Sequence, residues 1–212
     1  MVPDRPNRLD WGPMPEPLAV ALLVIPAYLL GTFPSAGLVA RAGGHDVLRE
    51  GSGNPGASNV ARLMGWKYGL LVLVADFAKG AVAAGVGLAV AGRPGAYVLG
   101  SAAVLGHVLP ATRRFKGGKG VATAGGMLVV LFPWIVLSLG LVWFVLARIL
   151  KLASVASLVV VVAFPVTVAL TGHDWWEVAI LGAIALVIVA RHLPNLRRLV
   201  RGQELRTDGS TG

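Results

Sequence analysis

The chain has 212 residues, of which 56% are hydrophobic and 14% charged, and it contains no cysteine. Soluble domains carry about a quarter charged residues, so this composition excludes an ordinary soluble protein and indicates an integral membrane protein. The formal net charge is +9, but basic loops in a membrane protein reflect orientation before nucleic-acid binding, so no nucleic-acid partner is expected. The lack of cysteine excludes disulfides, thiolate metal sites and a cysteine nucleophile.

The residues before about Glu16 are polar and rich in proline. They lack the basic start, short apolar core and small-residue cleavage site of a signal peptide, so the first apolar segment is expected to be the first membrane span. We interpret residues 1–17 as a polar N-terminal extension, 18–204 as a single transmembrane domain and 205–212 as a C-terminal tail.

Apolar segments of helical length recur along the whole chain. They fall at about 18–40, 68–91, 95–111, 119–132, 133–150, 153–171 and 175–190. The sequence therefore predicts an all-α integral membrane protein with about seven transmembrane helices. A full span needs roughly 20 residues, so we expect one or both of the segments 95–111 and 119–132 to be tilted, broken or shallow. Five spans, with this short pair outside the bilayer, are the alternative.

The lysines and arginines are divided unevenly between the two sides of this arrangement. With seven spans, one side holds only Arg5, Arg8 and Arg93, and Lys79 lies inside a span. The other side holds fifteen basic residues, namely Arg41, Arg49, Arg62, Lys67, Arg113, Arg114, Lys116, Lys119, Arg148, Lys151, Arg191, Arg197, Arg198, Arg201 and Arg206. Because basic loops stay in the cytoplasm, we expect the N-terminus outside and the C-terminus in the cytoplasm; five spans would give the same orientation.

The stretch between the two short segments combines glycines with lysines. Three glycines and two lysines fall within residues 116–120, and Gly106 and His107 precede them. Glycine lets the backbone approach a ligand closely and adopt positive φ, and bare amides at the start of the following helix attract anions. Lysine adds a point charge suited to phosphate. We expect Gly118 to lie where the backbone approaches a phosphate; a solvated basic loop is the alternative.

A second glycine-rich loop lies at 45–62. Its glycines and the later Asp76 spell a dinucleotide-binding fingerprint, but no strand precedes them and Asp76 lies in an apolar segment, so we reject that interpretation. The loop offers small donors to a polar ligand, and a tight polar turn is the alternative. The donors are Ser52, Asn54, Ser58 and Asn59.

Two ionisable residues lie inside the second apolar segment. Asp76 and Lys79 are three residues apart and therefore share a helix face. Charged groups within a membrane are costly and are usually paired or functional. We favour a structural pair, since each residue has the other as partner, and a proton or ion relay is the alternative.

Two further segments on the basic side carry polar residues. Ser154 belongs to a run of small residues that suits helix packing in lipid, although its hydroxyl also suits a ligand. The segment 191–204 is basic, which suits orientation and contact with anionic lipid. Neither purpose needs His192 or Asn195, so these two residues are candidates for the site.

Several common kinds of site are missing. The sequence shows no clustered metal ligands, no P-loop, and no histidine followed five residues later by aspartate, as in common glycerolipid acyltransferases. What remains is a phosphate-binding site beside lipid without an obvious strong base. A small anion transporter is the other class considered, but it should carry polar midplane residues on several spans, and here only Asp76 and Lys79 stand out.

Three segments in this order resemble the signature motifs of the bacterial membrane-embedded acyl-phosphate-dependent glycerol-3-phosphate acyltransferases. They are 51–62, 106–123 and 191–204. The resemblance implies transfer of an acyl group from acyl phosphate to the 1-hydroxyl of glycerol 3-phosphate, giving lysophosphatidic acid and phosphate. It also implies seven spans in the bacterial plasma membrane, a cytoplasmic site and neither metal nor cofactor. The expected partners are these two substrates, the lipid bilayer and a cytosolic enzyme that makes acyl phosphate.

The resemblance also implies roles for individual residues. Catalysis is expected of His107, Lys119, His192 and Asn195. Substrate or phosphate binding is expected of Ser52, Gly53, Asn54, Ser58, Asn59, Arg62, Lys116, Gly117, Gly118, Gly120 and Ser154, and a structural role of Asp76, Lys79 and Glu204. His107 is either a general base or a structural residue, and a substrate phosphate oxygen is an alternative proton acceptor.

The chain departs from the family pattern at two places that bear on the site. The arginine before the first motif comes one position late, as Arg49, and Leu48 stands where the arginine is expected. The middle motif has Arg113 and Arg114 where the family usually has apolar residues and glycine. The role of Arg49 and the effect of the arginine pair are therefore left open by the sequence.

Overall fold

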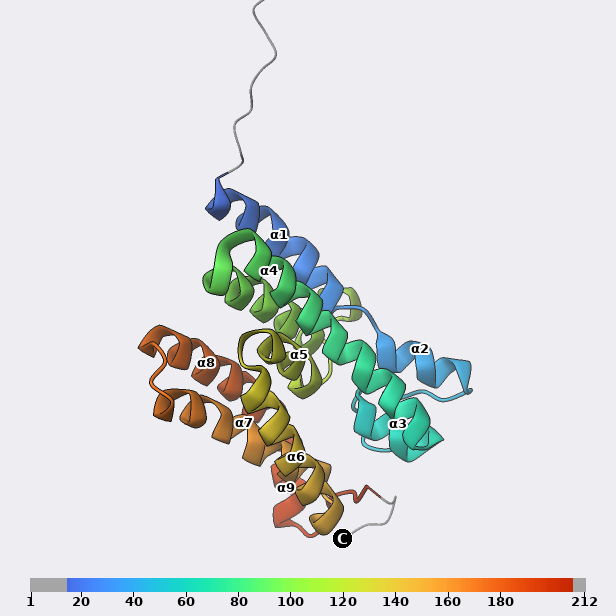
Figure 1. The fold of residues 1–212 in the computed structure, drawn as a ribbon. Helices are drawn as coiled ribbons and strands as arrows, with labels where there is room; N and C mark the ends of the chain where they lie inside the picture. The colour runs from blue at the N-terminus through green and yellow to red at the C-terminus, as the bar shows by residue number, and fades with distance from the viewer. Residues whose placement is uncertain (1–14, 208–212) are drawn as a thin grey trace, which may run out of the picture.

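The computed structural model describes residues 15–207, and over that range the chain is built from helices without a β-strand (Figure 1). Most of the predicted N-terminal extension and part of the predicted tail, with Arg5, Arg8 and Asp208, lie outside the described residues. The helices are α1 (Glu16–Gly31), α2 (Ser35–Ala42), α3 (Ala57–Met64), α4 (Trp66–Val108), a 3₁₀ turn η1 (Ala111–Arg113), α5 (Val121–Leu131), α6 (Pro133–Leu150), α7 (Ala153–Leu170), α8 (Trp175–Arg191) and α9 (Leu193–Val200).

Each predicted apolar segment is helical. The first is shared by α1 and α2, which are separated by a short break ending at Pro34, whose backbone has no N–H to continue a helix. The second and third segments both lie in α4, which is interrupted by non-helical φ and ψ at Ala91 and Gly92. Figure 1 shows the chain reversing direction there, so α4 is a helical hairpin.

Helix lengths partly settle which segments can cross a membrane. Within residues 15–207, four stretches are long and apolar enough: Glu16–Ala42, Trp66–Arg113, Pro133–Leu150 and Ala153–Leu170. α8 and α9, bent by 52°, pass the same test as a pair. α5 has 11 residues and is about 16 Å long, too short for a hydrocarbon core of about 30 Å. The fourth segment is therefore short, as expected, and the number of spans stays a prediction.

Glycines let the central helices pack backbone against backbone. A Cβ at Gly31 of α1 would overlap the carbonyl of Ala103 in the second half of α4. A Cβ at Gly80 in the first half of α4 would overlap the carbonyl of Thr123 in α5. Small residues at helix contacts in lipid allow this close approach, so α4 serves as the centre onto which α1 and α5 dock.

A buried ion pair connects the break between α1 and α2 to α4. Lys79 Nζ lies 2.6 Å from Asp76 Oδ1 and donates to the Phe33 carbonyl at 2.6 Å and to Ser35 Oγ at 2.8 Å. Ser35 in turn donates to Asp76. Both charged side chains are buried, and their partners outside α4, Phe33 and Ser35, come from the break between α1 and α2 and from the start of α2. The pair therefore fixes the break between α1 and α2 to α4.

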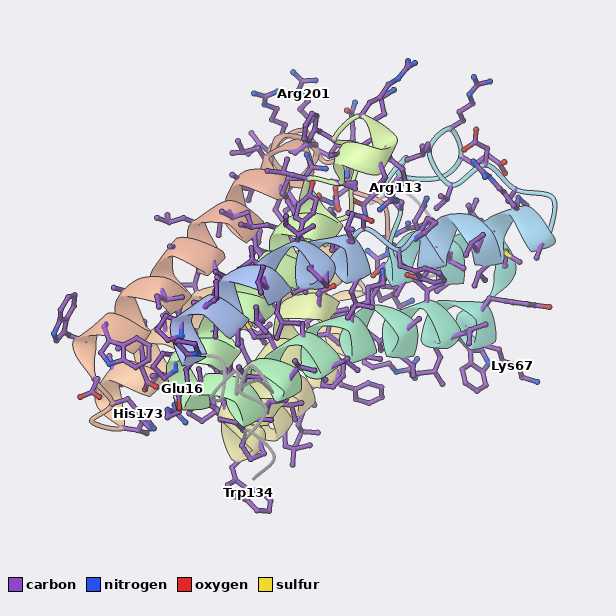
Figure 2. The ribbon with its side chains drawn as sticks, turned by 90° about the horizontal axis from the view of Figure 1, so that it is seen from above. Glu16, Lys67, Arg113, Trp134, His173 and Arg201 are labelled. Atoms are coloured by element: carbon purple, nitrogen blue, oxygen red, sulfur yellow. The ribbon has the colours of Figure 1, made fainter. Side chains whose placement is uncertain are left out.

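The two ends of the molecule differ in character. Figure 2 shows Glu16, Trp134 and His173 at one end and Arg113 and Arg201 at the other. At the first end, Trp134 is 78% exposed, as expected of an aromatic side chain at a membrane interface. The glycine-rich loop that follows Arg113 and helix α9, which ends beside Arg201, belong to the second end.

At the end that carries Trp134, an ion pair joins two helices that are far apart in the sequence. Arg93, beside the turn of the α4 hairpin, donates from Nε to Glu177 Oε1 of α8 at 2.6 Å. Its guanidinium also lies 4.9 Å from the centre of the Phe132 ring, at the junction of α5 and α6. Glu177 is buried, so this contact joins the α4 turn to α8 on the side away from the glycine-rich loops.

Candidate active site

A cavity of about 790 Å³ opens at the basic end of the molecule. Three segments line it: the loop before α3, the loop before α5, and the junction of α8 with α9. Among residues 15–207, the basic side chains of its lining are Arg49, Lys116, Lys119, Arg191, Arg197 and Arg198, and the one carboxylate is that of Asp46. Six cationic groups around one acid make the cavity a site for anionic ligands.

Arg191 holds the glycine-rich loop before α5 in a fixed conformation. It donates from Nη2 to the Gly117 carbonyl at 2.9 Å and from Nε to the Gly118 carbonyl at 3.3 Å. The Gly118 N–H donates to the His107 carbonyl at 3.1 Å. The peptide unit between Gly117 and Gly118 is thus pinned at both ends, and the Gly118 N–H is not available to a substrate.

The requirement for glycine at 118 differs from the one expected. Gly118 does not have positive φ, whereas Gly120 has φ +92°. A Cβ at Gly118 would overlap the imidazole of His107, and a Cβ at Gly117 would overlap the His107 and Val108 carbonyls. Both residues are glycine because the loop packs directly on the end of α4. The requirement for glycine at 118 thus has a packing reason, and its approach to a phosphate stays a prediction.

The N–H groups that are free to bind an anion follow Gly118 in the chain. The N–H groups of Lys119 and of the first three residues of α5 have no acceptor among residues 15–207. Unpaired amides at a helix N-terminus favour an anion. The Lys119 side chain lines the cavity, and burial lowers the pKa of its ammonium to about 8, while Glu204 acts in the opposite direction. Lys119 and the start of α5 therefore form the best anion site of this loop.

The loop before α3 is held by one buried side chain. Asn59 Oδ1 accepts from the Ser52 N–H at 2.8 Å, and Asn59 Nδ2 donates to the Val47 and Glu50 carbonyls, each at 3.1 Å. Asn59 is therefore occupied within the protein rather than placed at the cavity. The predicted ligands that do line the cavity from this loop are Ser52, Gly53 and Asn54.

Two other predicted ligands of this region lie outside the cavity lining. Ser58 is exposed on α3. Arg62 donates from Nε to the Arg206 carbonyl at 3.2 Å and from Nη2 to the Leu205 carbonyl at 3.4 Å. Arg62 thus ties α3 to the segment that follows α9.

Glu204 connects the residues predicted in the last part of the chain. Its Oε1 accepts from Ser154 Oγ at 2.8 Å and from Asn195 Nδ2 at 2.5 Å, and its Oε2 accepts from Arg198 Nε at 2.9 Å. The Ser154 hydroxyl therefore donates its proton within the protein, and Ser154 does not line the cavity. Asn195 lines the cavity, and its Oδ1 is buried without a partner among the described residues. Glu204 thus fixes the orientation of the amide and leaves Asn195 Oδ1 as an unsatisfied buried acceptor next to the cavity.

The two predicted catalytic histidines lie behind the cavity lining. His107 is buried against Gly118, and its Nδ1 lies 3.6 Å from Asp76 Oδ1. His192 Nδ1 lies 2.8 Å from the Ile188 carbonyl, which makes Nδ1 the donor and leaves the Nε2 lone pair. Neither ring lines the cavity, so we interpret His107 as a support for the glycine-rich loop.

The departures from the family pattern have different structural consequences. The Arg49 side chain is 87% exposed, lies 3.4 Å from Asp46 Oδ2, and reaches the cavity together with Leu48. Arg113 instead donates to the Thr32 carbonyl at 3.2 Å, outside the cavity. Arg114 and Phe115 have φ of +51° and +61°, an uncommon conformation for residues other than glycine, and Phe115 forms part of the cavity rim.

Sequence reasoning missed the role of Arg191, which it counted only among the basic residues of one face. Its position next to His192 in the third segment was a signal, but its partners lie 73 and 74 residues earlier in the chain. Within residues 15–207, no group of three or more His, Asp or Glu side chains is arranged so that it could hold a metal ion.

Comparisons with known proteins extend over nearly the whole chain. The family model for glycerol-3-phosphate acyltransferase matches residues 21–202. The glycerol-3-phosphate acyltransferase of Desulforudis audaxviator is 41% identical over 191 residues, covering 89% of this chain and 96% of the relative. The protein of that name from Bacillus subtilis is 34% identical over 188 residues, covering 88% and 97%.

Solved structures give the same result. The crystal structure of PlsY (YgiH), an integral membrane glycerol 3-phosphate acyltransferase, in its glycerol 3-phosphate form has a TM-score of 0.84 and 36% identity, and the match covers 89% of this chain and 95% of that chain. The lysophosphatidic acid form of the same protein has a TM-score of 0.82 at the same identity and coverage. The similarity therefore extends over most of both chains.

Proposed function

Because the chain belongs to the glycerol-3-phosphate acyltransferase family, we propose that it transfers an acyl group from an acyl phosphate to the 1-hydroxyl of glycerol 3-phosphate, giving lysophosphatidic acid and phosphate. The family resemblance seen in the sequence is confirmed, and it makes the chain an integral membrane enzyme of phospholipid biosynthesis. The observation that carries the finer proposal is the cavity itself, where six basic side chains surround one carboxylate. Two anionic substrates that must meet need such an excess of positive charge.

The free polar groups suggest where the substrates bind. We place a substrate phosphate at Lys119 and the start of α5, because this is where an ammonium and unpaired amides come together. A glycerol hydroxyl would donate to Asn195 Oδ1, the buried acceptor without a partner in the described structure. Ser52 and Asn54 offer further donors from the opposite wall.

The chemistry of the proposed donor fits this set of residues. An acyl phosphate is a mixed anhydride, so its carbonyl is already activated and phosphate is a good leaving group. The 1-hydroxyl oxygen forms the new ester bond to the acyl carbon, the bond from that carbon to the phosphate oxygen breaks, and the hydroxyl proton leaves on a phosphate oxygen. The protein then has to position two substrates and stabilise negative charge, which cationic and amide donors do.

We assign no step to a metal ion or to a histidine base. Asp46, the one carboxylate that the described residues contribute to the cavity lining, lies 3.4 Å from Arg49 and accepts from the Leu48 N–H at 3.0 Å. One carboxylate that is already paired in this way does not supply the several oxygen ligands of a metal site. His107 lies behind Gly118. A chelator is therefore expected to leave turnover unchanged.

We also propose that the cavity faces the cytoplasm of a bacterial plasma membrane, where a cytosolic enzyme supplies the acyl phosphate. The support is the fifteen-to-three division of basic residues in the sequence. The chain has no native cysteine, so a single cysteine at Gly209 is a clean probe. It should react with an impermeant thiol reagent only after the membrane is breached, and labelling in intact cells would contradict this orientation.

The donor is tested with the purified full chain in phosphatidylcholine vesicles. Glycerol 3-phosphate is supplied with either an acyl phosphate or the acyl-CoA of the same chain length, and lysophosphatidic acid is measured. Acyl phosphate should support turnover and acyl-CoA should not. Comparable rates with acyl-CoA would overturn the proposed donor while leaving the family assignment intact.

A further inference from the structure

α9 carries two faces with different surroundings. Its inward face holds Asn195 and Arg198, both of which donate to Glu204. Its outward face points away from that network. We define the outward face as Leu193, Leu196, Arg197, Val200 and Arg201, which together line a shallow groove of about 290 Å³. These positions recur at helical spacing, so the face is continuous along α9.

The outward face is apolar and basic at once. Val200 is 90% exposed and Leu193 is 48% exposed, so this face offers aliphatic surface that an apolar partner can cover. Arg197 and Arg201 flank these side chains, and Figure 2 shows Arg201 projecting from the end of the molecule. A short amphipathic surface of this kind, with aliphatic side chains beside arginines, suits the boundary between lipid chains and headgroups.

The position of α9 in the fold brings this face to the membrane boundary. α8 is an apolar helix of 17 residues, and α9 leaves it at an angle of 52° at the basic end of the molecule. A basic amphipathic helix that turns away from an apolar helix in this way fits a position at headgroup depth. Leu193 and Arg197 also line the large cavity, so the groove and the cavity share an edge.

We propose that the outward face of α9 is a binding surface for anionic phospholipids of the bilayer. The lipid chain lies against Leu193, Leu196 and Val200, and the headgroup phosphate lies between Arg197 and Arg201. The occupant is a bilayer lipid with a negative headgroup, because the face combines an apolar groove with two cations and no carboxylate among its residues. Such a lipid would hold α9 at a fixed depth with Asn195 turned to the cavity. This inference does not rest on the identity of the acyl donor.

The test measures lipid preference next to α9 rather than activity. The exposed Gln203 follows α9 directly, and a single cysteine there, in a chain without other cysteines, carries an environment-sensitive fluorophore. The labelled full chain is reconstituted in phosphatidylcholine vesicles that contain either brominated phosphatidylglycerol or brominated phosphatidylcholine. The ratio of quenching by the two brominated lipids reports local preference for the anionic headgroup.

We expect this ratio to exceed one in the parent chain and to fall about fivefold in Arg201→Gln, since a basic residue near an anionic surface contributes about that factor. Arg201→Lys should keep the preference, and high salt should weaken it. Arg41→Gln is the matched control, because it removes an equally exposed arginine from the end of α2 and should change nothing.

Three outcomes would overturn the proposal. One is equal quenching by the two brominated lipids in the parent chain. Another is an equal loss of preference in Arg41→Gln and Arg201→Gln, which would reveal only a general charge effect. The third is a raised KM for acyl phosphate in Arg201→Gln when the vesicles contain phosphatidylcholine alone, because the face would then belong to the reaction's own lipid. The first two outcomes do not depend on whether acyl phosphate is the donor, and the third applies to the donor that supports turnover.

Discussion

Two glycine-rich loops line the same cavity, and they are held in different ways. The loop before α3 is anchored by Asn59, which belongs to the helix that follows directly and bonds to groups seven to twelve residues away. The loop before α5 is anchored by Arg191, whose bonds reach back 73 and 74 residues, and by the end of α4. The first loop is thus a local structure, whereas the second depends on the assembly of α4 and α8 around it.

This difference assigns different tasks to the two loops. In the second loop, the Gly118 N–H and two carbonyls form hydrogen bonds within the protein. The N–H groups of Lys119 and of the start of α5 remain available to a ligand. The first loop forms its own turn, with the Gly53 N–H donating to the Glu50 carbonyl at 3.1 Å, and offers Ser52 and Asn54 from the opposite wall. We infer that changes in the second loop affect catalysis more strongly than changes in the first.

The largest effect is expected from Gly118→Ala. The added methyl would overlap the His107 ring, so the ring or the loop must shift, and a displacement of about 1 Å at a site can cost roughly a hundredfold in rate. We expect a similar loss in kcat/KM and a lower melting temperature. The double variant with His107→Ala should recover much of the loss, because it removes the obstructing ring. No recovery would show that Gly118 is needed for another reason.

Arg191→Gln is expected to have the next largest effect. It weakens two charge-assisted hydrogen bonds to the loop carbonyls, each worth about 1.5–3 kcal/mol, so kcat/KM should fall roughly ten- to a hundredfold. Steady-state kinetics should show a raised KM for glycerol 3-phosphate together with a lower kcat, and Arg191→Lys should restore part of both. Arg201→Gln, in phosphatidylcholine vesicles, is the control. Unchanged kinetics in Arg191→Gln would show that the Arg191 hydrogen bonds to the loop are not needed for catalysis.

The charge of Lys119 gives a pH-dependent test of the second loop. Burial lowers the pKa of this ammonium to about 8, so it carries its charge below that pH and loses it above. If it binds phosphate, kcat/KM should fall about tenfold per pH unit above pH 8, because kcat/KM reports the free enzyme. In Lys119→Arg this decline should move to higher pH, since arginine stays protonated. A decline at the same pH in both proteins would assign it to another group.

The smallest effect on turnover is expected from Asn59→Ala in the first loop. It leaves the Ser52 N–H and two carbonyls without their partner, which should lower the free energy of unfolding by about 1–3 kcal/mol. kcat at saturating substrate should change less than tenfold, because the loop supports binding from the opposite wall. Denaturant unfolding and kcat are measured together. A loss in kcat as large as that of Arg191→Gln would abolish the distinction between the loops.

Contacts between residues that are close in the sequence could be predicted, whereas contacts between residues that are far apart in the sequence could not. Asp76 and Lys79 are three residues apart on one helix, so their contact could be inferred from spacing alone. The seven apolar segments were likewise local patterns, and each is helical. Asn59 was predicted as a ligand, but asparagine side chains readily bond to nearby backbone, and here that local bonding holds the loop.

The long-range contacts could not be read from the sequence. Nothing local indicates that the Gly118 Cα faces the His107 ring or that Arg191 reaches the loop carbonyls. Arg93 and Glu177, which close the opposite end, are 84 residues apart. Many of the residues predicted as an anion-binding set line one cavity, and their role stays a prediction. The division between residues that face the cavity and residues that hold it required the packing of the helices.

The most direct test of the account is a crystal structure of this chain with glycerol 3-phosphate bound. The phosphate is predicted to lie within hydrogen-bond distance of Lys119 Nζ and the N–H groups at the start of α5, with a glycerol hydroxyl donating to Asn195 Oδ1. The Arg191 bonds to Gly117 and Gly118 should be unchanged. A phosphate bound outside this cavity, or one held by the Gly118 N–H after the loop has been released from His107 and Arg191, would contradict the account.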